Sequence, residues 1–130
     1  MRKLIGLASV LVLLAACTSQ LGTMALTASN NGATVDASVN QILNITLDSN
    51  VTTGFKWNLV TEPDAKVLKF LSSEYVAPTP RSQPVAGAGG TEVWKFQAVG
   101  AGSTTFKLAY FRPFDPKDVA KEFSLTVVVK

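Results

Sequence analysis

An alternation of apolar and polar residues in the middle of the chain limits the fold most strongly. Between residues 35 and 59, apolar side chains at odd-numbered positions form two runs: Val35, Ala37, Val39, Leu43, Ile45 and Leu47, followed by Phe55, Trp57 and Leu59. A period of two is typical of a β-strand with one face buried. The two runs therefore predict strands, with Asn50 to Phe55 as the stretch that joins them in a loop.

The rest of the chain repeats this pattern. Strands are predicted at Glu92–Ala98, Phe106–Tyr110 and Phe123–Val129, and Trp57, Trp94, Phe96 and Phe106 are expected in the core. Val67–Tyr75 alternates less regularly and is interpreted as a strand, with a short helical turn as the alternative. Strands spaced by about 10 residues, with glycine and proline turns and no helical period, predict an all-β sandwich.

The first residues resemble a bacterial lipoprotein signal. Arg2 and Lys3 precede an apolar run, and Leu14-Ala15-Ala16-Cys17 is similar to a lipobox. The resemblance implies removal of residues 1–16 and acylation of Cys17, whereas the alternative is an ordinary signal with a stray cysteine. Residues 17–32, rich in Ser, Thr, Asn and Gly, are predicted to be the acylated cysteine and a flexible tether. Residues 33–130 are predicted to be the folded domain. A bacterial cell-envelope location follows, and Thr18 after the cysteine favours the outer membrane of a Gram-negative cell.

Composition excludes several classes of function. The chain has 12 basic and 9 acidic residues, and Arg2 and Lys3 leave with the signal. This near balance, without a basic run, gives no reason to expect nucleic acid as a partner. The absence of histidine removes the usual Ser–His and Cys–His nucleophile systems and most zinc sites. We therefore expect no catalysis, no metal and no cofactor. A monomeric protein is expected, with pairing through an exposed edge strand as the alternative.

Three loops have unusual sequences. Asn50-Val51-Thr52-Thr53-Gly54-Phe55 combines two stiff β-branched residues with a glycine that tolerates positive φ, so a compact, rigid loop is predicted. Gly87-Ala88-Gly89-Gly90 allows its backbone to approach another molecule closely. Arg112-Pro113-Phe114 interrupts a strand. The simpler interpretations are turn formation for Gly54, positive φ for Gly89 and Gly90, and an ion pair of Arg112 with Asp115 or Glu74.

The types and order of these loops resemble the chagasin family of cysteine-peptidase inhibitors. That family has an Asn-Pro-Thr-Thr-Gly-aromatic loop, a Gly-x-Gly-Gly loop and an Arg-Pro-Trp loop, and Trp57 and Tyr110 match its flanking positions. The likeness extends over about Thr34 to Lys130. Val51 replaces the proline and Phe114 the tryptophan. These departures concern affinity and target range.

The resemblance implies an immunoglobulin-like β-sandwich with three functional loops at one end. It also implies tight, reversible inhibition of papain-like cysteine peptidases by blocking of the active-site cleft. Thr52 and Thr53 would enter the catalytic centre, the glycine loop would lie along one side of the cleft, and Phe114 would pack on the other. The expected binding residues are Asn50, Val51, Thr52, Thr53, Gly54, Phe55, Gly87, Ala88, Gly89, Gly90, Arg112, Pro113 and Phe114. An immunoglobulin-like binding or structural envelope lipoprotein for a non-peptidase partner is the alternative, since a fold does not fix a function.

Overall fold

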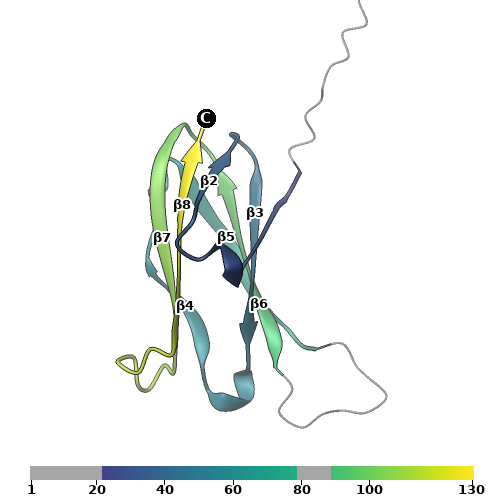
Figure 1. Cartoon of the computed structure of the whole chain (residues 1–130), viewed down its shortest axis with the longest axis vertical. Coiled ribbons are helices and arrows are strands. Elements are labelled where there is room, and N and C mark those ends of the chain that lie inside the picture. Colours follow the sequence, from purple (N-terminus) through teal and green to yellow (C-terminus); the bar gives the residue numbers. More distant parts are fainter. Residues whose placement is uncertain (1–21, 79–88) are drawn as a thin grey trace, which may run out of the picture.

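The computed structural model describes residues 22–78 and 89–130, which form a sandwich of two sheets (Figure 1). Its strands are β1 (Met24–Thr27), β2 (Thr34–Ala37), β3 (Ile42–Ser49), β4 (Lys56–Thr61), β5 (Leu68–Val76), β6 (Gly90–Ala98), β7 (Gly102–Phe111) and β8 (Lys121–Val129). Two short 3-10 helices accompany them, η1 (Ala28–Asn30) and η2 (Val51–Thr53). None of the helices in this described part is long and apolar enough to cross a membrane.

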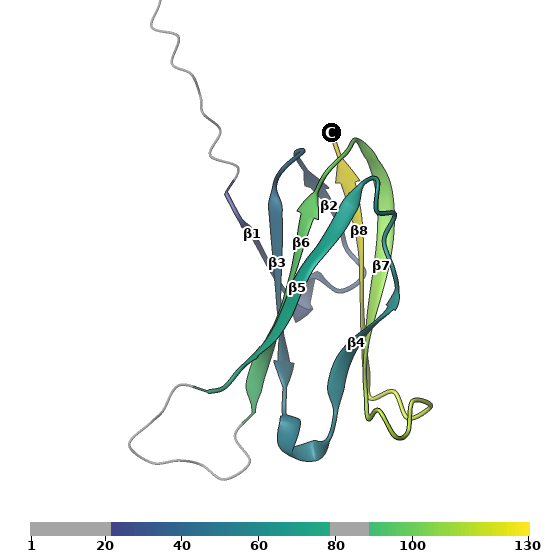
Figure 2. The same ribbon diagram turned by 180° about the vertical axis from the view of Figure 1, so that it is seen from behind.

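The strand order is β1-β3-β6-β5 in one sheet and β2-β8-β7-β4 in the other. β1 pairs with β3 and β2 with β8 in parallel, and the other neighbouring strands are antiparallel. The two sheets face each other across one apolar core (Figure 2). The predicted all-β sandwich is therefore confirmed.

The inward faces follow the period of two in the sequence. The largest fully buried side chains are Leu43, Ile45 and Leu47 on β3, Leu68 on β5, Phe96 on β6, Phe106 and Leu108 on β7, and Phe123, Leu125 and Val127 on β8. Trp57 and Trp94 are buried as well, so the four predicted core aromatics all lie in the core. Side chains that alternate inward on both sheets supply most of the stabilising apolar burial.

The long alternating run from Val35 to Leu47 is two strands in opposite sheets. β2 ends at Ala37 and β3 begins at Ile42, and Asn40 between them has φ +74°, which asparagine tolerates better than most residues. The turn occupies residues 38–41, an even number, so the parity of the apolar positions continues across it. The alternation therefore conceals the break, and Val39 lies exposed in the turn.

The predicted tether over residues 17–32 is wrong from Met24 onward. β1 pairs with β3 in the register Met24↔Leu43, and its Leu26 is buried in the core. The polar residues that suggested a tether instead form a capping box, in which the Thr27 hydroxyl accepts from Ser29 N and Asn30 Oδ1 accepts from Thr27 N. Cap residues and linker residues share one composition, so composition alone did not separate them.

β5 is a strand, as predicted, and its irregular alternation results from a β-bulge. The pairing with β6 shifts register between Phe70 and Ser72, which leaves Leu71 as the extra residue. Phe70 contacts the rings of Trp94 and Phe96 at centroid distances of 5.6 and 5.7 Å. The bulge therefore produces the spacing that resembled a helical turn.

The burial of Leu26 generates a stability prediction. We expect Leu26→Ala to lower the free energy of unfolding by about 2–4 kcal/mol, because it removes a buried side chain and leaves a cavity. Urea denaturation of the chain starting at Thr18 would measure this. Ala25→Ser, on the exposed face of the same strand, should change it by less than about 0.5 kcal/mol. Equal stability of both variants would indicate that this segment is a tether after all.

Candidate functional site

Three connections meet at one end of the sandwich. β3 ends at Ser49 and β4 begins at Lys56, β5 ends at Val76 and β6 begins at Gly90, and β7 ends at Phe111 and β8 begins at Lys121. In Figures 1 and 2 these strand ends lie together at the bottom, and the C-terminus lies at the opposite end. The expected grouping of loops is thus present for 50–55 and 112–114. Gly89 and Gly90 lie at the same end, whereas Gly87 and Ala88 fall outside the described residues.

The first loop is held by its own hydrogen bonds. Asn50 caps η2, and its Oδ1 accepts from Thr52 N at 3.1 Å and from Thr52 Oγ1 at 2.6 Å. Thr53 Oγ1 donates to the Asn50 carbonyl oxygen at 2.6 Å. Gly54 closes the turn at φ +81°, a conformation that strains residues with a side chain. The predicted compact, internally fixed loop is confirmed.

A buried carboxylate fixes the two strands on which this loop is mounted. Glu92 on β6 is 3% exposed. Its Oε2 accepts from Ser49 Oγ at 2.7 Å, at the end of β3, and from Trp57 N at 3.0 Å, at the start of β4. Ser49 belongs to one sheet and Trp57 to the other, so one carboxylate oxygen joins the sheets directly beneath the loop. A buried carboxylate is tolerated only when such donors satisfy it.

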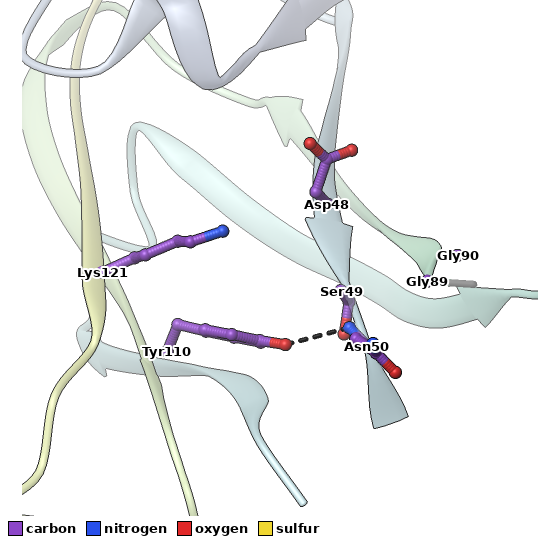
Figure 3. A pocket seen from close by; sticks show the side chains of 7 residues that line it. All are labelled: Asp48, Ser49, Asn50, Gly89, Gly90, Tyr110 and Lys121. Carbon is purple, nitrogen blue, oxygen red and sulfur yellow. Dashed lines mark hydrogen bonds between the residues drawn. The ribbon is translucent and has the colours of Figure 1, made fainter. Parts of the chain in front are cut away.

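Two further hydrogen bonds join the two sheets at the base of the loop. Tyr110 on β7 accepts from Asn50 N through its hydroxyl at 2.9 Å, and Trp57 Nε1 donates to the Asp48 carbonyl oxygen at 3.0 Å. Figure 3 shows the Tyr110 hydroxyl reaching Asn50 across a hollow that Lys121 also lines. The hollow has a volume of about 280 Å³ and lies between the bases of the loops.

Contacts between aromatic rings extend from the base of the first loop to the loop at 112–114. The Tyr110 ring lies between Trp57 and Phe55, at centroid distances of 5.1 and 5.2 Å. The Arg112 guanidinium carbon lies 4.5 Å from the Phe55 centroid and 5.9 Å from that of Phe114. Stacking and cation–π contacts of this kind each contribute about 0.5–1 kcal/mol. They form a column from the core to the loop tip.

Arg112 also joins the two loops by a hydrogen bond. Its Nε donates to the Thr53 carbonyl oxygen at 3.1 Å. Within the described ranges the structure records no ion pair of Arg112 with Asp115 or Glu74, so the ion-pair interpretation is wrong. With Asp115, Arg112 makes a backbone contact instead, in which Asp115 N donates to the Arg112 carbonyl oxygen at 2.9 Å. The Phe114 ring lies beside Gly54, where an added Cβ would be 3.6 Å from it.

Gly89 and Gly90, at the connection between β5 and β6, allow close packing and do not supply a positive φ. Neither Gly89 nor Gly90 has a positive φ. A Cβ at Gly90 would overlap the Val76 carbonyl oxygen, and one at Gly89 would lie 3.2 Å from that of Ser49. Gly90 is therefore required by the fold, and the interpretation that these glycines supply positive φ is wrong.

The tips of the loops expose apolar side chains on this fixed frame. Phe114 is 78% exposed and Val51 is 50% exposed. The surrounding threonines, Thr52 and Thr53, are exposed too. No group of three His, Cys, Asp or Glu residues lies close enough to bind a metal in the described part. Exposed apolar side chains at the tips of rigid loops are typical of a surface that binds another protein.

Sequence reasoning missed the polar cluster beneath the loops. Glu92 has the parity of Trp94 and Phe96, and Ser49 has the parity of Leu47. A carboxylate in phase with core residues was the available signal, since such a group is buried only with partners. Its partners lie on two other strands, Ser49 on β3 of the same sheet and Trp57 on β4 of the opposite sheet. The alternation does not reveal which strands meet.

The comparisons with known proteins agree with this geometry. Residues 36–127 match the family described as Chagasin family peptidase inhibitor I42. The chain belongs to the chagasin family of peptidase inhibitors. Chagasin of Trypanosoma cruzi is 33% identical over 92 residues, which cover 68% of this chain and 81% of chagasin. The family consists of inhibitors rather than enzymes, in agreement with the expectation of no catalysis.

Two solved structures share the chagasin-family fold. The first is a cysteine protease inhibitor of Entamoeba histolytica, with a TM-score of 0.69 and 24% identity, over 83% of this chain and 95% of that one. The second is PbICP-C in complex with falcipain-2, with a TM-score of 0.61 and 19% identity, over 83% of this chain and 91% of the other. These likenesses support the immunoglobulin-like sandwich.

Glu92 should therefore determine how firmly the inhibitor holds its first loop. We expect Glu92→Ala to lower the free energy of unfolding by about 3 kcal/mol, because Ser49 Oγ and Trp57 N lose a charged acceptor inside the protein. Glu92→Gln keeps one acceptor oxygen and should lose less than half as much. Urea denaturation measures both, and a Glu92→Ala variant as stable as the parent would contradict this role.

Proposed function

We propose that this protein is a reversible, tight-binding inhibitor of papain-like cysteine peptidases. The observation that carries the proposal is the fixed arrangement of two exposed loops, 50–55 and 112–114, joined by the Arg112–Thr53 hydrogen bond at the tip of a chagasin-family domain. Relatives with this fold are described as cysteine protease inhibitors, and one is in complex with the peptidase falcipain-2.

In the proposed complex, the loop end of the sandwich fills the active-site cleft of the peptidase. The first loop, with Thr52 and Thr53 at its centre, faces the catalytic cysteine and histidine. Phe114 packs against one wall of the cleft, and the segment containing Gly89 and Gly90 lies along the other. Gly87 and Ala88 belong to the same proposed contact, although they lie outside the described residues.

The physical basis for tight binding is preorganisation. Association costs free energy because interface side chains and loops lose freedom, and loops that are already fixed lose little. Hydrogen bonds and ring contacts hold the first loop and Arg112 before any partner arrives. A protease–inhibitor interface of standard size buries about 800 Å² on each partner. Exposed aromatic anchors such as Phe114 commonly supply most of the binding free energy.

We further propose that one inhibitor molecule acts on one peptidase. β5 is one of the two edge strands of its sheet and exposes Phe70, Leu71, Tyr75 and Val76. Its bulge at Leu71 interrupts the regular ladder that a second copy would need for pairing. This supports a monomer with one binding end.

We also propose that Cys17 anchors the protein to a bacterial envelope membrane. The lipobox-like sequence before Cys17 supports this, with the outer membrane favoured in a Gram-negative cell. β1 begins at Met24, which pairs with Leu43 at the start of β3, far from the loop end. Residues 18–23 span at most about 20 Å. An anchor at Cys17 would thus hold the domain near the membrane with its loops directed away.

The proposed inhibition predicts a difference between two matched valine variants. Val51 in the first loop and Val60 at the far end of β4 are 50% and 49% exposed. We expect Val51→Arg to raise the inhibition constant for papain at least about 30-fold, as loss of a central contact does. Val60→Arg should leave it within about twofold, because an exposed strand residue tolerates charge.

Inhibition constants measured on chains starting at Thr18, with melting curves as a check of folding, decide the matter. If Val51→Arg inhibited papain as strongly as Val60→Arg, the first loop would not be part of the interface. A wild-type chain that is folded but does not inhibit would favour the alternative of a binding or structural lipoprotein.

The anchor predicts the behaviour of a cysteine variant. In bacteria that process lipoproteins, we expect the full chain to enter the membrane fraction with fatty acid attached, and Cys17→Ala to lose both properties. Fractionation and mass spectrometry of the mature N-terminus measure this. Wild-type protein with an unmodified thiol at Cys17 would contradict the proposal.

A further inference from the structure

Three carbonyl groups of the first loop, those of Asn50, Val51 and Thr53, accept hydrogen bonds within the protein. The Asn50 carbonyl accepts from Thr53 N at 3.2 Å, and the Val51 carbonyl accepts from Gly54 N at 3.1 Å. The Thr53 carbonyl accepts from Arg112 Nε at 3.1 Å. The first two bonds lie within the loop, whereas the third depends on a side chain from another loop, 59 residues further along the chain.

Contacts on both sides hold the Arg112 side chain in the position from which it donates to the Thr53 carbonyl. Its guanidinium lies over the Phe55 ring and near Phe114, and its Cγ would be 3.8 Å from a Cβ at Gly54. The backbone of its loop is closed by Asp115 N donating to the Arg112 carbonyl and by Ala120 N donating to the Tyr110 carbonyl, both at 2.9 Å. The donor at Nε is therefore fixed relative to the Thr53–Gly54 peptide bond.

A cysteine peptidase needs the opposite arrangement in a substrate. Its thiolate adds to a carbonyl carbon whose oxygen turns into the oxyanion site, while the chain lies extended in the cleft. Residues 51–53 form a helical turn instead. At the exit of this turn, the Thr53 oxygen cannot enter an oxyanion site while it accepts from Arg112.

We propose that Arg112 is a positioning residue that protects the Thr53–Gly54 bond from cleavage by the inhibited peptidase. This inference rests on the proposed function. Removal of the side chain frees the Thr53 carbonyl and lets the first loop extend, so the inhibitor becomes a slow substrate. In that reaction the thiolate bonds to the Thr53 carbonyl carbon and the Gly54 nitrogen leaves with a proton. Water then releases the Thr53 carboxylate and restores the thiol.

The test compares cleavage and inhibition in the same samples. Wild type, Arg112→Ala, Arg112→Lys and Lys117→Ala are incubated with papain, and intact mass and fragment masses are followed over time. Lys117 lies exposed in the same loop, so its variant controls for the loss of one positive charge. We expect Arg112→Ala to be cut between Thr53 and Gly54 at least about tenfold faster than wild type or Lys117→Ala. Arg112→Lys, which keeps the charge without the flat stacking group, should fall between them.

The outcomes separate this inference from the proposed function. Folded Arg112 variants that stay intact overturn the inference, whether or not their inhibition constant rises. Cleavage at some other bond overturns it too, because the protected carbonyl is that of Thr53. A wild-type chain that neither inhibits papain nor is cut by it overturns the proposed function itself, and with it the inference. A change in inhibition constant alone assigns Arg112 to target contact.

Discussion

The carboxylate of Glu92 is the constraint on which the functional end depends. Its Oε2 accepts from Ser49 on one sheet and from Trp57 on the other. A sandwich is stabilised mainly by apolar burial, which is non-directional and does not fix the separation of strand ends. Directional hydrogen bonds to a buried charge do fix it, because any displacement leaves that charge unsatisfied. The strands that carry the first loop therefore emerge from the core at one defined spacing.

Contacts above the Glu92 carboxylate fix the two loops as well. Tyr110 binds Asn50 through its hydroxyl and stacks on Phe55 with its ring, and Arg112 covers Phe55 and binds Thr53. Two loops that are far apart in the sequence thus behave as one surface with an exposed aromatic tip. For the proposed inhibitor this has two effects: little entropy is lost on docking, and the carbonyls of Asn50, Val51 and Thr53 are occupied by internal hydrogen bonds.

Much of this was predictable from the sequence, for reasons that particular residues illustrate. Phe96, Phe106 and Leu125 follow a period of two, so the strands and their buried faces could be predicted. Gly54 indicated the turn, where it has a positive φ. The turn at Asn40 was hidden because it preserves parity, and β1 was hidden because Thr27 and Asn30 are cap residues as well as linker residues. The partners of Glu92 and Arg112 lie on other strands or loops, and no local pattern encodes such pairings.

The most direct test of the central claim is a titration of papain with the soluble chain starting at Thr18. The account predicts that peptidase activity falls in proportion to added inhibitor, reaches zero at one molecule per active site and returns on dilution. The inhibitor recovered from the complex should be uncut. Full peptidase activity in the presence of micromolar, demonstrably folded protein would contradict the account, because it excludes the tight binding that preorganised loops should give.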